Sequence, residues 1–134
     1  MLAPKHRLTT SQDYSAVMRR GFRAGTTTVV VSVLLTEAGA GAADPSRSAA
    51  PWRCGFIVSK AVGNAVTRHR TTRRLRHIVR ELITSEAVTL PGKGRAAIVI
   101  RALAESAEAD HATLTEDVRS GLRRAAKKAQ RASA

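Results

Sequence analysis

Hydrophobic positions recur at helical spacing near the start of the chain. Residues 10–20 carry apolar side chains at i, i+3 and i+4, which predicts a short helix with one narrow buried face. Those side chains are Tyr14, Val17 and Met18. Thr10 is a favourable residue to cap the helix, and Gly21 can end it.

Three segments carry the β-branched, alternating pattern of strands: residues 26–35, 52–58 and 95–101. One face of the first segment is entirely apolar and is predicted to face the core: Val29, Val31, Val33 and Leu35. The other face is also mostly apolar, so we expect it to be partly covered: Val30, Ser32 and Leu34.

Two longer helices are predicted in the second half of the chain. The first runs from about Asn64, a favourable cap, to Ser85. Its apolar face is strongly periodic: Leu75, Ile78, Val79, Leu82 and Ile83. The second begins at Asp110 or Thr113 and runs to Ala129. A glutamate three residues after Thr113 predicts a capping box at the later start.

The segments between these elements are predicted to be loops. Residues 36–51 are dominated by Ala, Gly, Ser and Pro, which predicts a flexible loop, and residues 91–94 are predicted to turn. Residues 130–134 are expected to form a frayed basic tail. The length of 134 residues suits one domain, which we expect over residues 1–129.

The composition excludes several classes of protein. No apolar run approaches the ~18 residues that span a bilayer, and no apolar segment follows the first charges to make a signal peptide. The single cysteine, Cys54, allows no intramolecular disulfide and no thiolate metal cluster. We therefore expect a cytoplasmic protein with no membrane partner.

Positive charge is concentrated in patches. The chain has 23 Lys and Arg against 10 Asp and Glu, a net charge of +13. Seven of these cations lie between Lys60 and Arg80 and six between Arg119 and Arg131, with no acid in either segment. A small domain with this charge is expected to bind a polyanion, most often nucleic acid.

Most basic residues of the long helix share one side of it. The apolar face around Leu75 lies opposite a row of basic side chains: Arg70, Arg73, Arg74, His77 and Arg80. His69 and Arg76 lie at the border of this row, whereas Arg68 lies in line with the apolar face at the helix start. Cations without counter-acids repel one another, so a polyanionic partner is expected here.

The residue pattern gives no sign of catalysis by protein side chains. The ten acids form no carboxylate cluster typical of a two-metal nuclease, and the four histidines are scattered along the chain. A histidine acid–base pair stays an open alternative at this point. Cys54 is expected to be a small buried hydrophobe. We therefore predict no catalytic residue and no metal site in the protein.

One segment resembles a known family signature. Val58–Arg76 contains Val-Ser-Lys-Ala-Val-Gly-Asn-Ala-Val-Thr-Arg-His-Arg, followed by further basic residues. It closely resembles the signature of the bacterial ribonuclease P protein subunit, which combines a Ser-Lys strand end, Gly-Asn-Ala-Val and Arg-Asn-Arg. The opening helix, the strand ending in Ile98–Arg101, the length and the basicity also resemble that family.

The resemblance implies a fold. The family has a single α+β domain in which a four-stranded sheet is packed with three helices, similar to a domain of a ribosomal protein. It adds a short strand near residues 22–25, which the pattern alone does not predict. It also implies a left-handed βαβ crossover, where the general rule would predict a right-handed one.

The resemblance also implies a function, as the protein subunit of ribonuclease P. The catalyst is an RNA subunit that hydrolyses precursor tRNA with Mg²⁺ bound mainly by the RNA, and no cofactor held tightly by the protein or small-molecule substrate is implied. The residues implied to bind the catalytic RNA are Lys60, Asn64, Arg68, His69, Arg70, Arg73, Arg74 and Arg76. Those implied to line a cleft for the 5′ leader of precursor tRNA are Lys5, Arg7, Tyr14, Met18, Val30 and Ser32.

The chain departs from the family pattern at several positions. His69 stands where Asn is usual, and Ala61 stands where Lys is common. Met18 and Ser32 occupy cleft positions that usually hold aromatic residues, so stacking on the leader is expected to be weaker. Two alternatives remain open: a structural RNA-binding protein of ribosomal type without a role in cleavage, and a DNA-binding protein of nucleoid type.

Overall fold

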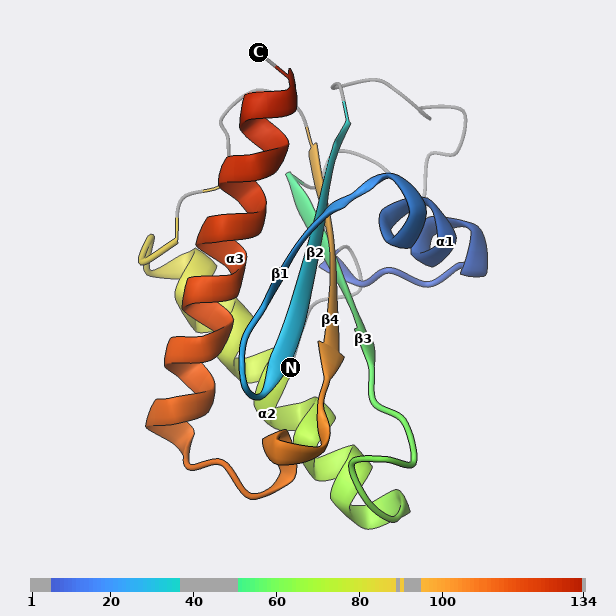
Figure 1. Cartoon of the computed structure of the whole chain (residues 1–134), viewed down its shortest axis with the longest axis vertical. Coiled ribbons are helices and arrows are strands. Elements are labelled where there is room, and N and C mark those ends of the chain that lie inside the picture. The colour runs from blue at the N-terminus through green and yellow to red at the C-terminus, as the bar shows by residue number, and fades with distance from the viewer. Residues whose placement is uncertain (1–5, 37–50, 89, 91–94, 134) are drawn as a thin grey trace.

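The computed structural model describes residues 6–36, 51–88, 90 and 95–133. These residues form one sheet with helices on both of its faces (Figure 1). In chain order the elements are α1 (Ser11–Arg20), β1 (Phe22–Gly25), β2 (Val29–Thr36), β3 (Trp52–Ile57), α2 (Ala65–Thr84), β4 (Arg95–Ala102), the 3₁₀ helix η3 (Ala104–Ala107) and α3 (His111–Ser133).

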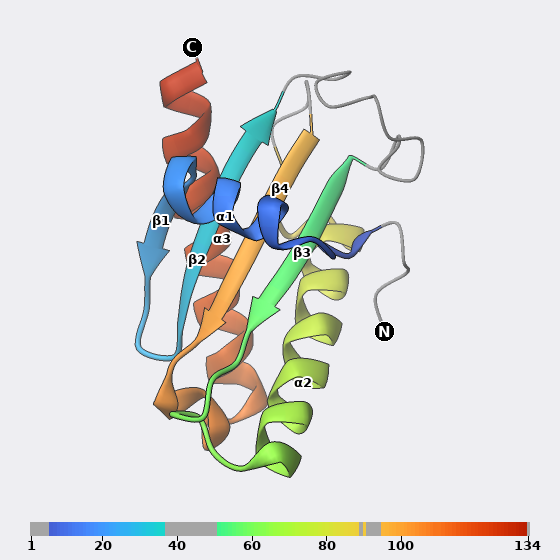
Figure 2. The same cartoon turned by 90° about the vertical axis from the view of Figure 1, so that its right-hand side faces the viewer.

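The four strands lie in the order β1-β2-β4-β3. β2 is antiparallel to both of its neighbours, whereas β3 and β4 are parallel. α2 joins the parallel pair on the face opposite α1, and this crossover is left-handed (Figure 2). The expected α+β fold is thus confirmed, including the short strand β1 and the crossover that the general rule does not predict.

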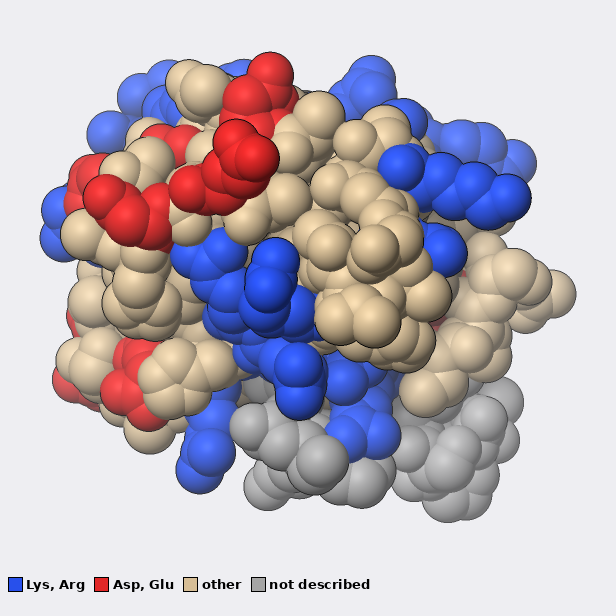
Figure 3. All heavy atoms as spheres, turned by 90° about the horizontal axis from the view of Figure 1, so that it is seen from below, with Lys and Arg blue, Asp and Glu red and all other residues tan. Residues whose placement is uncertain are grey.

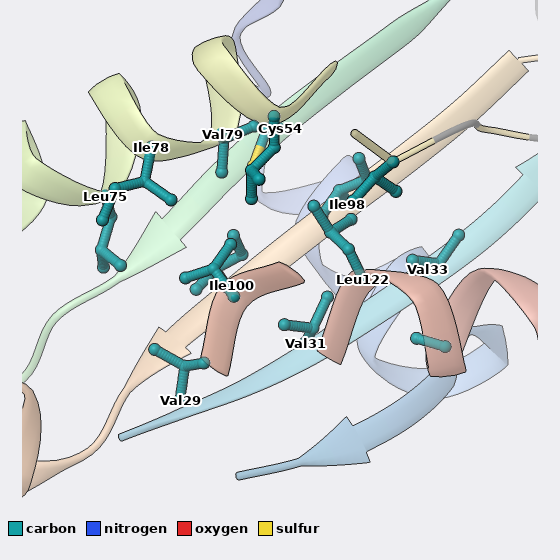
Figure 4. Close-up of a cluster of buried hydrophobic side chains, with 14 of the residues drawn as sticks. Val29, Val31, Val33, Cys54, Leu75, Ile78, Val79, Ile98, Ile100 and Leu122 are labelled. Atoms are coloured by element: carbon teal, nitrogen blue, oxygen red, sulfur yellow. The ribbon is translucent and has the colours of Figure 1, made fainter. Parts of the chain in front are cut away.

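Strand alternation sorts the side chains of the sheet onto two faces. The side chains of one face pack with α2 and α3 in the main core, part of which is drawn in Figure 4. The strands contribute Val29, Val31, Val33, Ile98 and Ile100, and the helices contribute Leu75, Ile78, Val79 and Leu122. On the other face, Val99 of β4 packs with Val17 of α1 and with Leu8 in a smaller apolar cluster. α1 crosses only one half of this second face, which leaves the other half open (Figure 2).

Two helix starts agree with the sequence. The Thr10 hydroxyl oxygen accepts a hydrogen bond from the Asp13 backbone N–H at 3.1 Å, and α1 ends at Gly21 as expected. The Asn64 side-chain oxygen accepts from the Thr67 backbone N–H at 2.9 Å. Each cap satisfies an N–H that the helix itself cannot pair.

α3 begins at the earlier of its two predicted starts, whereas its end differs from the prediction. The predicted capping box does not form; instead the Asp110 carboxylate accepts from the Thr113 backbone N–H at 2.7 Å, which selects the earlier start. The helix continues to Ser133, so residues 130–133 are helical rather than frayed. The last turns are anchored because Ala129 is buried and the Lys128 ammonium donates to the Arg23 carbonyl at 2.7 Å.

Two further predictions concern the segments around the strands. β2 begins three residues later than predicted, because the Thr26 N–H donates to the Val29 carbonyl at 2.8 Å and makes a turn. Of the predicted loop over residues 36–51, residues 37–50 lie outside the described part of the chain, as do the predicted turn over 91–94 and Lys5.

Within the described residues, no helix is long and apolar enough to cross a membrane.

Candidate nucleic-acid interface

An ordered turn precedes α2. The Val62 and Gly63 N–H groups donate to the Ser59 and Lys60 carbonyls, and Val62 is buried as an anchor. Gly63 has a φ of 154°, a conformation that favours glycine, and a Cβ there would press on the Thr67 side chain. The turn therefore presents Lys60 to solvent next to the first turn of α2.

The outer face of α2 is basic and exposed. Thr71, Leu75, Ile78, Val79 and Leu82 are buried on the inner face, as the apolar periodicity predicts. The predicted RNA-binding residues that are exposed are Lys60, Asn64, His69, Arg70 and Arg73. Seen from the end where α2 begins, Lys and Arg side chains form a central band beside a group of acids (Figure 3). The structure thus brings these predicted residues onto one surface.

Arg68 and Arg76 are half-buried at the border of this surface. Within the described part of the chain, the Arg68 Nε lies buried without a hydrogen-bond acceptor. A buried donor without a partner costs about 1–3 kcal/mol, so an acceptor brought by a ligand would be favoured here. The prediction that Arg68 lies in line with the apolar face agrees with this partial burial.

Arg74 has a structural role that the sequence did not suggest. Its guanidinium donates to the Ser106 carbonyl at 3.3 Å and to the Ala109 carbonyl at 2.6 Å, which fixes the segment after β4 to α2. The hydrogen bonds from Thr113 hold the pKa of the nearby Asp110 carboxyl below its usual value, and the Arg74 charge adds to this effect. Arg74 therefore contributes to the fold, and its predicted contact with RNA stays a prediction for its remaining N–H groups.

The half of the sheet that α1 leaves open forms a second surface. Strand register places four residues side by side there: Gly25, Val30, Arg101 and Ile57. Arg101 and Gly25 are exposed, and Val30 and Ile57 are half-buried. In the neighbouring row, Ser32 and Val99 are buried. The open row is therefore a shallow apolar strip with an arginine in it.

Tyr14 is fixed at the border of this open surface. Its ring lies so close to Gly55 that a Cβ on that glycine would clash with the ring. Its hydroxyl oxygen accepts a hydrogen bond from the Phe56 backbone N–H at 3.1 Å. Burial raises the pKa of the Tyr14 hydroxyl, and the hydrogen bond from Phe56 opposes that shift. The tyrosine is thus half-buried and held in one position.

The other predicted cleft residues divide by exposure. Met18 is half-buried beside the cluster under α1. Arg7 is also half-buried, and its backbone forms an isolated parallel bridge with Cys54 at the edge of β3. Ser32 lies on the expected face but is 1% exposed, so it is closed to a ligand in this structure.

Arg23 and Arg101 are basic residues of this face that sequence analysis did not select. Register pairs Arg23 with Ser32 and Arg101 with Val30, and both arginines are exposed. The alternation in β4 holds the signal for Arg101: Ile98 and Ile100 face the core, so Arg101 must face the other side. Strand pairing, which the sequence does not give, is needed to place it beside Val30.

The histidines, the cysteine and the acids were the remaining candidates for chemistry. Among them, no group of three His, Cys, Asp or Glu side chains is placed to hold a metal ion. Cys54 is buried, and burial raises the pKa of its thiol, which suits the predicted core role. His77 and His111, far apart in sequence, are neighbours with ring centroids 6.2 Å apart, and His6 stacks on Trp52 at 3.9 Å.

Comparison with known proteins identifies relatives over nearly the whole chain. The family model described as Ribonuclease P matches residues 2–126. The ribonuclease P protein component of Streptomyces avermitilis is 42% identical over 127 residues, covering 92% of this chain and 94% of the relative. That of Corynebacterium jeikeium is 43% identical over 132 residues, covering 93% of this chain and 98% of the relative.

Solved structures share the fold. The RNase P protein of Staphylococcus aureus has a TM-score of 0.67 at 18% identity, covering 90% of this chain and 94% of that protein. The RNase P protein of Thermotoga maritima has a TM-score of 0.66 at 23% identity, covering 88% of this chain and 98% of that protein. Fold, sequence relatives and family model agree. The chain therefore belongs to the ribonuclease P protein family, as a protein component of that enzyme.

Proposed function

We propose that this chain binds the catalytic RNA of ribonuclease P through the outer face of α2 and holds the 5′ leader of precursor tRNA on the open half of the sheet. As a protein component of this endoribonuclease, it has a role in tRNA 5′ processing. The observation that carries the proposal is the exposed basic face of α2, over residues 60–80 that include no Asp or Glu, together with the ordered turn before the helix.

Phosphate contacts are the interaction that the α2 surface suits best. Its candidate contacts are Lys60, Asn64, Arg68, His69, Arg70, Arg73, Arg74 and Arg76. Arginine forks bind phosphate oxygens with two parallel hydrogen bonds, and each neutralised phosphate releases counterions. The Asn64 oxygen is used by the helix cap, which leaves its amide nitrogen as the group that can donate to RNA.

The unpaired Arg68 Nε is a second observation that supports phosphate binding by the α2 surface. A phosphate oxygen beside it would satisfy a donor that the described part of the chain leaves without an acceptor. His69 follows Arg68 on the exposed side of the helix. A neutral imidazole can still donate one hydrogen bond there, as the usual Asn does, although its geometry differs.

The open sheet surface suits a single strand of RNA. Such strands bind where a basic groove follows the backbone and flat or apolar side chains contact the bases. Here Tyr14, Met18 and Val30 supply the apolar part, and Arg7 and Arg101 supply positive charge. These contacts carry no base-edge pattern, so we propose leader binding with little sequence preference.

The chemical step is assigned to the RNA subunit. The described side chains do not gather in a metal site, so we propose that the Mg²⁺ of the hydrolysis is held mainly by the RNA and that no protein side chain reacts. The protein would act in the cytoplasm by binding and orienting the two RNAs.

The test is cleavage of a precursor tRNA with a 5′ leader by the cognate catalytic RNA at low Mg²⁺, with and without this protein. We expect the protein to raise the cleavage rate and precursor to bind the complex more tightly than mature tRNA. If the protein binds RNA but leaves cleavage unchanged, the alternative of a structural RNA-binding protein is favoured.

A matched pair of variants tests the α2 surface within that assay. Arg73→Gln removes an exposed cation of the surface, whereas Arg119→Gln removes a cation of α3 that is paired with Glu116 at 2.7 Å. We expect only the first variant to weaken binding of the catalytic RNA. Equal effects of both variants would indicate a general charge effect instead.

A further inference from the structure

The C-terminal half of α3 carries a second concentration of positive charge. Five cations occur within residues 123–131, and the last acid before them is Asp117. All five are exposed: Arg123, Arg124, Lys127, Lys128 and Arg131. The rise of 1.5 Å per residue spreads them over about 12 Å of one side of the helix. Arg123, Lys127 and Arg131 follow one another at i+4, a spacing at which like charges destabilise a helix.

Two of these cations are fixed against the edge of the sheet. The Arg124 guanidinium donates to the Gly25 carbonyl at 2.8 Å, and the Lys128 ammonium donates to the Arg23 carbonyl at 2.7 Å. Carbonyl acceptors orient the two side chains without cancelling their charge. The exposed Arg23 belongs to the same edge strand, with its side chain on the open face of the sheet, so positive charge lies on both sides of this edge.

This second basic surface is separate from that of α2. Figure 2 shows α3 behind β1 at one edge of the sheet and α2 behind β3 at the other. Along the chain, exposed acids of η3, its following segment and the start of α3 separate α2 from the basic half of α3: Glu105, Glu108, Asp110 and Glu116. In Figure 3 acidic side chains likewise lie between the central basic band and basic side chains at the upper left edge.

We propose that the basic half of α3, together with the β1 edge, binds the phosphate backbone of a second segment of RNA. The acids between the two surfaces would repel a strand that ran directly from one to the other, so each surface takes its own segment. This inference goes beyond the proposed function, which uses only α2 and the open face of the sheet. The segment belongs either to the catalytic RNA or to the body of the precursor tRNA, and both present the same phosphates.

The test uses the complex of protein, catalytic RNA and precursor tRNA. The variant Arg123→Gln/Lys127→Gln/Arg131→Gln removes the three cations that make no hydrogen bond to β1, so we expect it to fold with an unchanged or higher melting temperature. Each lost phosphate contact changes the slope of log affinity against log salt by about 0.7–0.9. We expect the slope to become shallower by about 2–3.

Two measurements identify the source of the phosphates. The slope is determined once for protein with the catalytic RNA alone and once for precursor tRNA binding to the assembled complex. A change in the first places the segment in the catalytic RNA, and a change only in the second places it in the precursor. Unchanged slopes in both measurements would overturn the proposal.

Charge-conserving variants separate charge from helix structure. Arg123→Lys/Arg131→Lys keeps the three charges, so the salt slope should stay that of the native protein. A slope as shallow as that of the triple glutamine variant would contradict phosphate binding through charge. Because Arg73→Gln on α2 acts on a different surface, its effect on the slope should add to that of the α3 variant.

Discussion

The Tyr14 hydroxyl oxygen accepts a hydrogen bond from the Phe56 backbone N–H at 3.1 Å, and this bond fixes α1 to β3 across the sheet. The ring can reach that position only because residue 55 has no side chain. α1 therefore covers half of the sheet in a defined place, and the border of the open half is set by one tyrosine and one glycine.

Gly55→Ala should destabilise the protein through this contact. The added methyl group would clash with the Tyr14 ring, and forcing extra atoms into a packed site typically costs about 1–3 kcal/mol. Urea unfolding measures the loss. In the double variant with Tyr14→Ala the clash is gone, so the two costs should be less than additive. Full additivity would show that the methyl group is accommodated elsewhere.

Variants at Tyr14 should separate stability from leader binding. Tyr14→Phe keeps the ring and loses the hydrogen bond, so stability should fall by about 0.5–1.5 kcal/mol while precursor binding is retained. Tyr14→Ala removes the stacking surface, and binding of a leader-bearing precursor should weaken by about 1–3 kcal/mol. Mature tRNA is the control, because it has no leader. Equal losses for precursor and mature tRNA would contradict the placement of the leader at Tyr14.

Arg73 and Arg74 are neighbours in sequence that should respond differently to substitution. Arg74→Ala removes the donor from the Ser106 and Ala109 carbonyls, so we expect a loss of about 1–3 kcal/mol in unfolding free energy. Arg73→Ala should leave stability unchanged and reduce the salt slope of catalytic-RNA binding by about one charge. Paired unfolding and binding titrations distinguish the two. Unchanged stability in Arg74→Ala would show that these two hydrogen bonds do not contribute to the unfolding free energy.

The cap at the start of α3 should make stability depend on acid pH. Hydrogen bonds from Thr113 lower the pKa of Asp110 from its ordinary 3.8, so the unfolded chain binds the proton more readily than the folded one. The stabilisation is therefore present above that ordinary value and is lost as the pH falls through the lower folded pKa. Asp110→Asn keeps a capping oxygen without the charge. Its melting temperature should fall less over this pH range than that of the native protein.

Local patterns were sufficient to predict most elements of this fold. Apolar side chains at helical spacing and the two caps gave α1 and α2 nearly to the residue, because capping and burial of one face are local properties. The division of α2 into a buried and a basic face followed from the same periodicity. The end of α3 was wrong, because contacts with β1, which are distant in sequence, hold its last turns in place.

Properties that depend on packing between elements were not predictable in this way. β1 and the left-handed crossover came from the resemblance alone. The structural bonds of Arg74 depend on where η3 packs, and the burial of Ser32 depends on where α1 crosses the sheet. The row that joins Val30 with Arg101 exists only through strand register. Whether the predicted residues contact RNA stays a prediction that the binding experiments test.

The side chains that fasten α3 to the sheet also have a consequence for solubility. An exposed strand edge is a template for pairing with another chain, and β1 and β3 are the two edge strands here. Arg124 and Lys128 occupy carbonyls of β1, and the Leu8 N–H occupies the Cys54 carbonyl of β3. A second copy could extend the sheet only by breaking these bonds and bringing like charges together. Before its RNA is present, the protein is thus protected against strand-mediated aggregation by basic side chains at β1 and by the chain segment around Leu8 at β3.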